Sequence, residues 1–222
     1  METPDIATPI HARIVEGLER IATALKSDDW SRAQAAGVNP TQLSILRTLE
    51  GRNAGLSVKD LSFQLGVSQP TVTDSILALE RKSLVEKRPD PADGRAVRVV
   101  ITDTGRAAVQ AGDAATGTVG QAAAALDDED QELLLVQLVS LIRQLQEQGA
   151  IPIQRMCVSC RYFRPYAHDD AARPHHCNFV DAAFGQQDLR IDCRDHETAD
   201  PSVRAATWAT FQKGRPLHPP GN

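Results

Sequence analysis

The 222-residue sequence has no cysteine before Cys157 and no apolar run that approaches the ~18 residues of a membrane-spanning helix. Its first residues also lack a basic start followed by an apolar stretch, which is the pattern of a secretory signal. These absences predict a cytoplasmic protein with no membrane partner. Disulfides are rare in that reducing compartment, so the four cysteines are expected to bind a metal or to carry thiol redox chemistry.

Catalytic motifs are also lacking. The sequence contains no nucleophile elbow, no Gly-rich phosphate loop and no His-Glu-x2-His zinc pattern. The acidic run Asp127–Asp130 suits the start of a helix better than a pair of catalytic carboxylates. We therefore expect a protein that is not an enzyme. The net charge of −5 does not point to nucleic acid, although a local basic surface is sufficient to contact phosphates.

Hydrophobic residues make up 41% of the sequence, enough for a substantial core, and their spacing predicts a helical first part. Apolar residues three and four apart indicate a helix over Pro9–Lys26, and Asn39-Pro40 marks the start of a second helix. Ser57 can cap a short third helix, Gly66 permits a sharp turn, and Ser68 can cap a fourth helix. This order is that of a helix-turn-helix.

Two β-prone runs follow, at Val85–Arg88 and Val97–Ile101, and the segment between them contains Pro, Asp and Gly residues that favour a turn. A helix-turn-helix followed at once by such a hairpin predicts a winged helix. A long Ala-rich helix is expected from Thr102 or Asp103, and another from Asp127-Asp128. The apolar stripe of this last helix is Leu134, Leu138, Leu141 and Leu145.

Over about residues 10–148 the sequence resembles the MarR (multiple antibiotic resistance regulator) family of bacterial transcription factors. The resemblance is carried by Leu61-x3-Leu65-Gly66-Val67-Ser68-Gln69-Pro70-Thr71-Val72-Thr73, Leu79-Glu80-x3-Leu84-Val85, Asp90–Ala96 and Ile101-Thr102-x2-Gly105. It implies a homodimer whose first and last helices intertwine. It also implies a recognition helix in the major groove of double-stranded DNA and a wing over the minor groove. The expected fold class is mainly α with a small β-wing (α+β).

Candidate DNA-binding residues lie in the fourth helix and the hairpin. Hydroxyl and amide groups at the start of the recognition helix can bond to phosphates and base edges, and these are Ser68, Gln69, Thr71 and Thr73. Arg95 at the wing tip can enter a narrow minor groove, with Asp93 fixing its orientation. Arg88 and Arg98 are expected on backbone phosphates. For single basic residues outside the wing tip, a solvated surface charge is the alternative interpretation.

Two positions depart from the family pattern. Asp74 stands where many members carry a basic residue, and its carboxylate would repel phosphate but can accept a hydrogen bond from cytosine N4. Ser83 stands where relatives often have glycine after the recognition helix, so a different helix cap is expected there.

The composition changes after Gly149, since the remaining residues hold every cysteine, both tyrosines and five of the six histidines. We therefore predict a winged-helix and dimerisation domain at residues 1–149 and a small Cys-rich metal-binding C-terminal module at 150–200. A partly disordered tail is expected at 201–222, most clearly from Gly214 onward.

The cysteines are spaced Cys157-x2-Cys160-x16-Cys177-x15-Cys193, so one close pair is followed by two single thiols. Structural zinc sites more often use two close pairs. The Cys-x2-Cys-x-aromatic-Phe opening is similar to that of high-potential iron–sulfur proteins, which implies a [4Fe-4S] cluster on all four cysteines. Zn2+ is the principal alternative, and a [2Fe-2S] cluster or a thiol redox switch also stays open.

Other side chains of this module suit either kind of centre. Its aromatic residues can shield a cluster or form the core of a domain that needs a metal to fold, and these are Tyr162, Phe163, Phe179 and Phe184. The histidines are interpreted as outer donors or surface residues, although a mixed Cys/His zinc site is geometrically possible, and these are His168, His175, His176 and His196.

The functional hypothesis combines the two parts of the sequence. It is a DNA-binding transcriptional repressor whose operator affinity is modulated by a [4Fe-4S] cluster that responds to redox state, oxygen or iron. One alternative keeps DNA binding but has a structural zinc site and a small-molecule effector. Another is a protein-interaction or redox module whose winged helix has lost DNA affinity.

Overall fold

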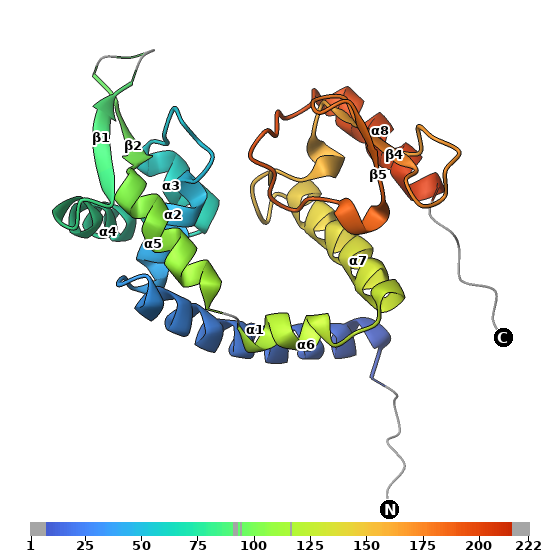
Figure 1. Ribbon diagram of the computed structural model, residues 1–222, viewed down its shortest axis with the longest axis horizontal. Coiled ribbons are helices and arrows are strands. Elements are labelled where there is room, and N and C mark those ends of the chain that lie inside the picture. Colours follow the sequence, from blue (N-terminus) through green and yellow to red (C-terminus); the bar gives the residue numbers. More distant parts are fainter. Residues whose placement is uncertain (1–7, 91–92, 94, 116, 215–222) are drawn as a thin grey trace, which may run out of the picture. The chain divides into compact units, whose positions relative to one another are not determined.

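The computed structural model describes residues 8–90, 93, 95–115 and 117–214 (Figure 1). The chain divides into two compact units, of which the first ends at Leu126 and the second begins at Asp127. This boundary lies earlier than the predicted one at 149/150. Among the described helices, none is both long and apolar enough to cross a membrane.

The first unit contains a helix-turn-helix followed by a two-stranded wing (Figure 1). Its elements are α1 (Ile10–Ala35), α2 (Pro40–Leu49), α3 (Val58–Leu65), α4 (Gln69–Arg81), β1 (Val85–Pro89), β2 (Val97–Ile101), α5 (Asp103–Ala114) and α6 (Thr118–Ala124).

Helix starts in this unit follow the predicted caps. The side chains of Asn39, Ser57 and Ser68 each accept a hydrogen bond from the backbone N–H three residues further on. Gly66 ends α3 in the left-handed conformation, with φ 64°, and Ser83 adopts the same conformation after α4, with φ 58°. Ser83 thus takes the backbone shape for which glycine is usual, and its carbonyl accepts a hydrogen bond from the Thr102 hydroxyl (2.8 Å).

The hydrophobic core of the first unit joins the helix-turn-helix to the wing. Strands β1 and β2 pair antiparallel with Val85 opposite Ile101. The buried cluster contains Leu43, Ile45, Leu46, Leu49, Leu61, Val72, Ile76, Leu79, Leu84, Val99 and Val109, among others. Gly105 of α5 lies so close to the residue that precedes β1 that a Cβ atom there would be 2.1 Å from the Leu84 carbonyl oxygen, which explains the glycine of this motif. The predicted winged helix-turn-helix is confirmed.

Two helices differ in length from the sequence prediction. Helix α1 continues to Ala35 instead of ending at Lys26, and the expected long Ala-rich helix is two helices, α5 and α6. The reason for the second difference lies in Asp28 of α1. Its carboxylate accepts hydrogen bonds from the backbone N–H groups of Thr118 (2.9 Å) and Val119 (3.0 Å), so that a new helix starts there.

Acidification is expected to loosen this contact between α1 and α6. The backbone N–H of Val119, followed by that of Thr118, lowers the pKa of Asp28 below its usual value of 3.8. A carboxylate with a lowered pKa stabilises the fold above its unfolded-state pKa, and the contribution is lost as the pH falls through the lower folded-state value. Amide exchange at Thr118 and Val119 should therefore accelerate below about pH 4 relative to that of α2. Asp28→Asn should show fast exchange already at neutral pH, and equal exchange in both proteins would contradict this role.

Apolar side chains on α1 remain uncovered within the first unit. They lie three or four residues apart and are exposed to between 36% and 70%, and they are Ile10, Ile14, Leu18, Ile21 and Leu25. Such a stripe has the period of a helix face that packs on a partner.

The second unit builds a helical frame around short strands and 3₁₀ turns. Its elements are α7 (Asp128–Glu147), η1 (Cys157–Ser159), β3 (Phe163–Arg164), β4 (His175–Cys177), β5 (Ala182–Phe184), η2 (Gln186–Asp188) and α8 (Pro201–Lys213). Asp127 caps α7 as predicted, by accepting a hydrogen bond from the Asp130 N–H (2.9 Å). The three strands form one antiparallel sheet in the order β3-β4-β5.

A shared core explains why the unit boundary precedes α7. Val136 and Val139 of α7 belong to the same buried cluster as the Cys-rich residues and as Trp208 and Phe211 of α8. Residues 201–213, predicted as part of a tail, are therefore a helix that completes this core. The remainder of the predicted tail, from residue 215 onward, lies outside the described residues.

Candidate functional site

The N-terminal part of α4 presents a polar surface. All five side chains that the sequence nominates there are exposed, and these are Ser68, Gln69, Thr71, Thr73 and Asp74. The opposite face of α4 is buried through Val72 and Ile76. The hydroxyls are ordered by local bonds, since Ser68 Oγ and Thr71 Oγ1 are 2.8 Å apart and Thr73 Oγ1 donates to the Gln69 carbonyl (2.8 Å). The predicted recognition residues therefore lie together on the exposed surface at the N-terminal end of α4.

The wing carries three arginines that are predicted to contact DNA, and each lies in a different environment. Arg88 is exposed and forms an ion pair with Glu86 through Nε at 2.8 Å. Arg95 is exposed, and its backbone N–H donates to Asp93 Oδ1 (3.0 Å), so Asp93 orders the backbone at the wing tip. The wing positions 91, 92 and 94 lie outside the described residues.

Arg98 is already engaged within the unit. Its guanidinium donates to Asp90 Oδ2 (2.6 Å) and to the Gly55 carbonyl (3.3 Å), and only 29% of its side chain is exposed. Arg98 thereby ties the base of the wing to the loop before α3. Its phosphate contact stays a prediction, and the structure gives it a role in holding the wing that the sequence did not suggest.

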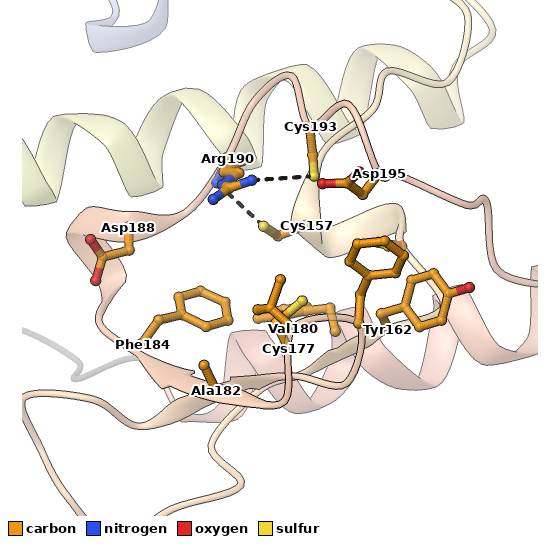
Figure 2. A pocket seen from close by; sticks show the side chains of 13 residues that line it. Cys157, Tyr162, Cys177, Val180, Ala182, Phe184, Asp188, Arg190, Cys193 and Asp195 are labelled. Atoms are coloured by element: carbon orange, nitrogen blue, oxygen red, sulfur yellow. Dashed lines mark hydrogen bonds between the residues drawn. The ribbon is translucent and has the colours of Figure 1, made fainter. Parts of the chain in front are cut away.

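The four cysteines of the second unit line one cavity of about 270 Å³ (Figure 2). All four thiols are free, and Cys160 is buried while the other three are half-buried. The predicted aromatic shield lines the same cavity, and its members are Tyr162, Phe163, Phe179 and Phe184. Segments 157–163, 177–184 and 188–195 thus line the same cavity, and ligation of a metal by the four cysteines stays a prediction.

Arg190 contacts two of these cysteines, and Figure 2 shows it beside both sulfurs. Its backbone N–H donates to Cys157 Sγ (3.3 Å), and its guanidinium Nη1 donates to Cys193 Sγ (3.7 Å). The hydrogen bond to the Cys193 sulfur raises the pKa of Arg190 above its usual value. Burial raises the pKa of Cys157 to about 11, against the opposing effect of the Arg190 N–H. The sequence reasoning missed Arg190, whose only signal was a basic residue three positions before Cys193.

The histidines lie around the cavity without forming part of its wall in the described part of this unit. His175 is fully buried among aromatic rings and accepts a hydrogen bond from the Tyr166 backbone N–H (3.2 Å), and burial lowers its pKa to about 4. His196 bonds to the Ser159 hydroxyl (2.9 Å), and His176 to Asp181 (3.2 Å). His175 is therefore a core residue, an environment that the sequence prediction of outer donors or surface residues did not include.

The donor set differs in its fit to two kinds of metal centre. A single Zn2+ needs its sulfurs about 2.3 Å from one point. Within the described ranges, no three Cys, His, Asp or Glu side chains are grouped closely enough to hold one metal ion. The four free thiols instead line an apolar cavity, and thiolates are the ligands that iron–sulfur clusters use, so the [4Fe-4S] cluster stays a prediction.

The first unit has the fold of a winged-helix DNA-binding protein. Residues 38–97 match the sequence model of the MarR family, so the chain contains a MarR-family domain.

Solved structures agree with this fold. Sco5413 from Streptomyces coelicolor, a MarR family transcriptional regulator, is 22% identical over 63% of this chain and 98% of its own, with a TM-score of 0.52. CouR from Rhodococcus jostii RHA1, solved bound to p-coumaroyl-CoA, is 18% identical over 66% of this chain and 98% of its own, with a TM-score of 0.51. The MarR family transcription regulator SP03579 is 17% identical over 63% and 92%, with a TM-score of 0.54. No curated protein matches the chain.

Proposed function

We propose that the protein is a homodimeric transcriptional repressor that binds double-stranded DNA. The observations that carry this proposal are the exposed polar end of α4 and an exposed arginine on the wing, in a domain of the MarR family. The exposed apolar stripe of α1 supports dimerisation, because a face of that period needs a partner. Relatives of this fold have been described as transcription regulators.

The DNA contacts follow from the chemistry of each exposed group. The α4 residues Ser68, Gln69, Thr71 and Thr73 can bond to base edges in the major groove, while the helix end itself favours phosphate. Asp74 beside them would select cytosine, whose N4 amino group is a donor. Arg95 suits the minor groove and Arg88 the backbone phosphates.

The second part of the proposal is that the cysteine-lined cavity holds a [4Fe-4S] cluster which modulates operator binding. The cavity is lined by four free thiols and by aromatic rings that would keep water away. When bound, such a cluster supplies one-electron chemistry and sensitivity to oxidants or iron supply. Cys157, Cys160, Cys177 and Cys193 would hold it, and Arg190 would hydrogen bond to two of them.

Anaerobic purification tests both parts together. We expect about four iron and four sulfide per chain and a broad absorption near ~400 nm. Operator DNA should be bound with strong salt dependence, and removal of the iron by a chelator should change the operator affinity. A colourless protein with one zinc per chain would contradict the proposed iron–sulfur cluster. Equal affinity for operator DNA and for unrelated DNA would contradict the proposed role as a repressor.

A further inference from the structure

We propose that residues 186–193, which we call the strap, couple the metal centre to helix α7. The proposal rests on the proposed function, because it needs a metal in the cysteine-lined cavity. The strap begins with η2, continues through Leu189 and Arg190, and ends at Cys193. One of its ends therefore contacts the cysteines while the other packs on a helix.

Arg190 ties the strap to the metal end. Its backbone donates to Cys157 Sγ (3.3 Å) and its carbonyl accepts from the Cys157 N–H (3.0 Å), so the two residues are joined twice. Its guanidinium also reaches Cys193 Sγ (3.7 Å). Hydrogen bonds to sulfur strengthen as the sulfur becomes more negative. The position of the strap should therefore depend on whether the thiolates carry a metal.

Leu189 ties the strap to the helix end. The turn η2 packs directly against α7. The side chain of Leu189, immediately before Arg190, is 5% exposed and lies in the same core as Val136 and Val139 of α7. Ile191 is on the same strap but is 36% exposed. A displacement of Arg190 should therefore also move the neighbouring Leu189, whose side chain packs in the core that contains Val136 and Val139 of α7.

Helix α7 has a second apolar face that this unit leaves open. Leu133, Leu134 and Leu141 are exposed to 52%, 43% and 40%, although Val136 and Val139 between them are buried. The helix therefore has one face in the core of the metal-binding unit and another available to a second copy of the chain. A strap that holds or releases the inner face would alter how the outer face packs.

The test compares Leu189→Ala with the matched control Ile191→Ala, each with bound iron and after removal of iron by a chelator. For wild type we expect at least a tenfold difference in operator affinity between the two states. Ile191→Ala should keep that ratio. Leu189→Ala should retain its iron and operator binding, yet its ratio should fall below about threefold. Since 1.4 kcal/mol corresponds to tenfold, an effect of this size is readily resolved. If Leu189→Ala shows the same ratio of operator affinities with and without iron as the wild type, the proposed coupling through the strap is wrong.

Hydrogen exchange keeps the proposal testable if Leu189→Ala cannot fold. Removing iron from the wild-type protein should accelerate amide exchange in the strap and around Val136–Val139, without changing α2. Unchanged exchange in α7 would overturn the coupling. Arg190→Gln should lose iron to the chelator about tenfold faster than wild type, and Arg190→Lys should recover part of the difference. Wild-type protein without iron would instead refute the proposed cluster, so the two failures are distinguishable.

Discussion

Replacing both Cys157 and Cys160 by serine is expected to abolish metal binding and to lower the melting temperature of the second unit strongly while the winged helix keeps its stability. The two residues flank Val158 and Ser159, which are buried, and Cys160 itself belongs to the core with Phe163 and Trp208. Free energies of metal binding in small metal-dependent domains reach about 10–16 kcal/mol for zinc fingers, as large as the total stability of about 5–15 kcal/mol of ordinary proteins. Loss of the metal should therefore remove a large share of the free energy that stabilises the second unit.

Circular dichroism and limited proteolysis would measure this result. Cleavage should appear between residues 150 and 200 in the double variant, with a stable fragment containing the first unit. Arg161→Ala is the matched control, because Arg161 follows Cys160 directly but is exposed, and its guanidinium contacts Glu197 (3.2 Å) and the Tyr162 ring (5.6 Å to the centroid) at the surface. That variant should keep its metal and its melting temperature. If the double serine variant melts like wild type, the cysteines are not the ligands that hold this unit together.

Sequence reasoning succeeded where the cause of structure is local. Four of the predicted helix starts have a capping side chain that accepts a hydrogen bond from the N–H three residues further on, at Asn39, Ser57, Ser68 and Asp127. The hairpin after α4 follows from β-prone runs around turn residues in the same way. The four cysteines line one cavity, as expected of thiols gathered in one polar segment, while their ligation of a metal stays a prediction.

Prediction failed where distant residues decide. The break between α5 and α6 depends on Asp28, about ninety residues earlier in the chain. The buried face of α7 passes through Val136 and Val139, whereas the leucine stripe chosen from periodicity includes Leu134 and Leu141, which are exposed. Both faces of this helix are apolar, so periodicity could not identify which one the second unit covers.

The helix α8 was missed for a related reason. Its sequence has no strong apolar stripe, and its contribution to the core comes from two large aromatic residues, Trp208 and Phe211. Their rings stack at a centroid distance of 5.6 Å, and Arg143 of α7 lies 5.9 Å from the Trp208 ring. A few such contacts are sufficient to bury a short helix without producing a pattern in the sequence.

Arg95→Ala is expected to weaken operator binding by about tenfold to a hundredfold, since a well-placed arginine contact is worth about 1–3 kcal/mol and each 1.4 kcal/mol is a factor of ten. Arg95 is exposed at the wing tip and bears no other assigned role, while Asp93 holds its backbone (3.0 Å). A guanidinium placed in a narrow minor groove also displaces counterions. The slope of log affinity against log salt should therefore fall by about one.

The matched control for this prediction is Arg106→Ala. Arg106 is an arginine of α5 that forms only a surface ion pair with Asp103 (3.2 Å), so its loss removes the same charge without touching the wing. Fluorescence anisotropy over a range of salt concentrations would give affinity and slope for both variants. Asp93→Ala should have a smaller effect than Arg95→Ala, because it frees the backbone of the wing tip but leaves the cation in place. Equal affinities and equal slopes for Arg95→Ala and Arg106→Ala would mean that the wing does not enter the groove. Recognition would then depend on the exposed end of α4 alone.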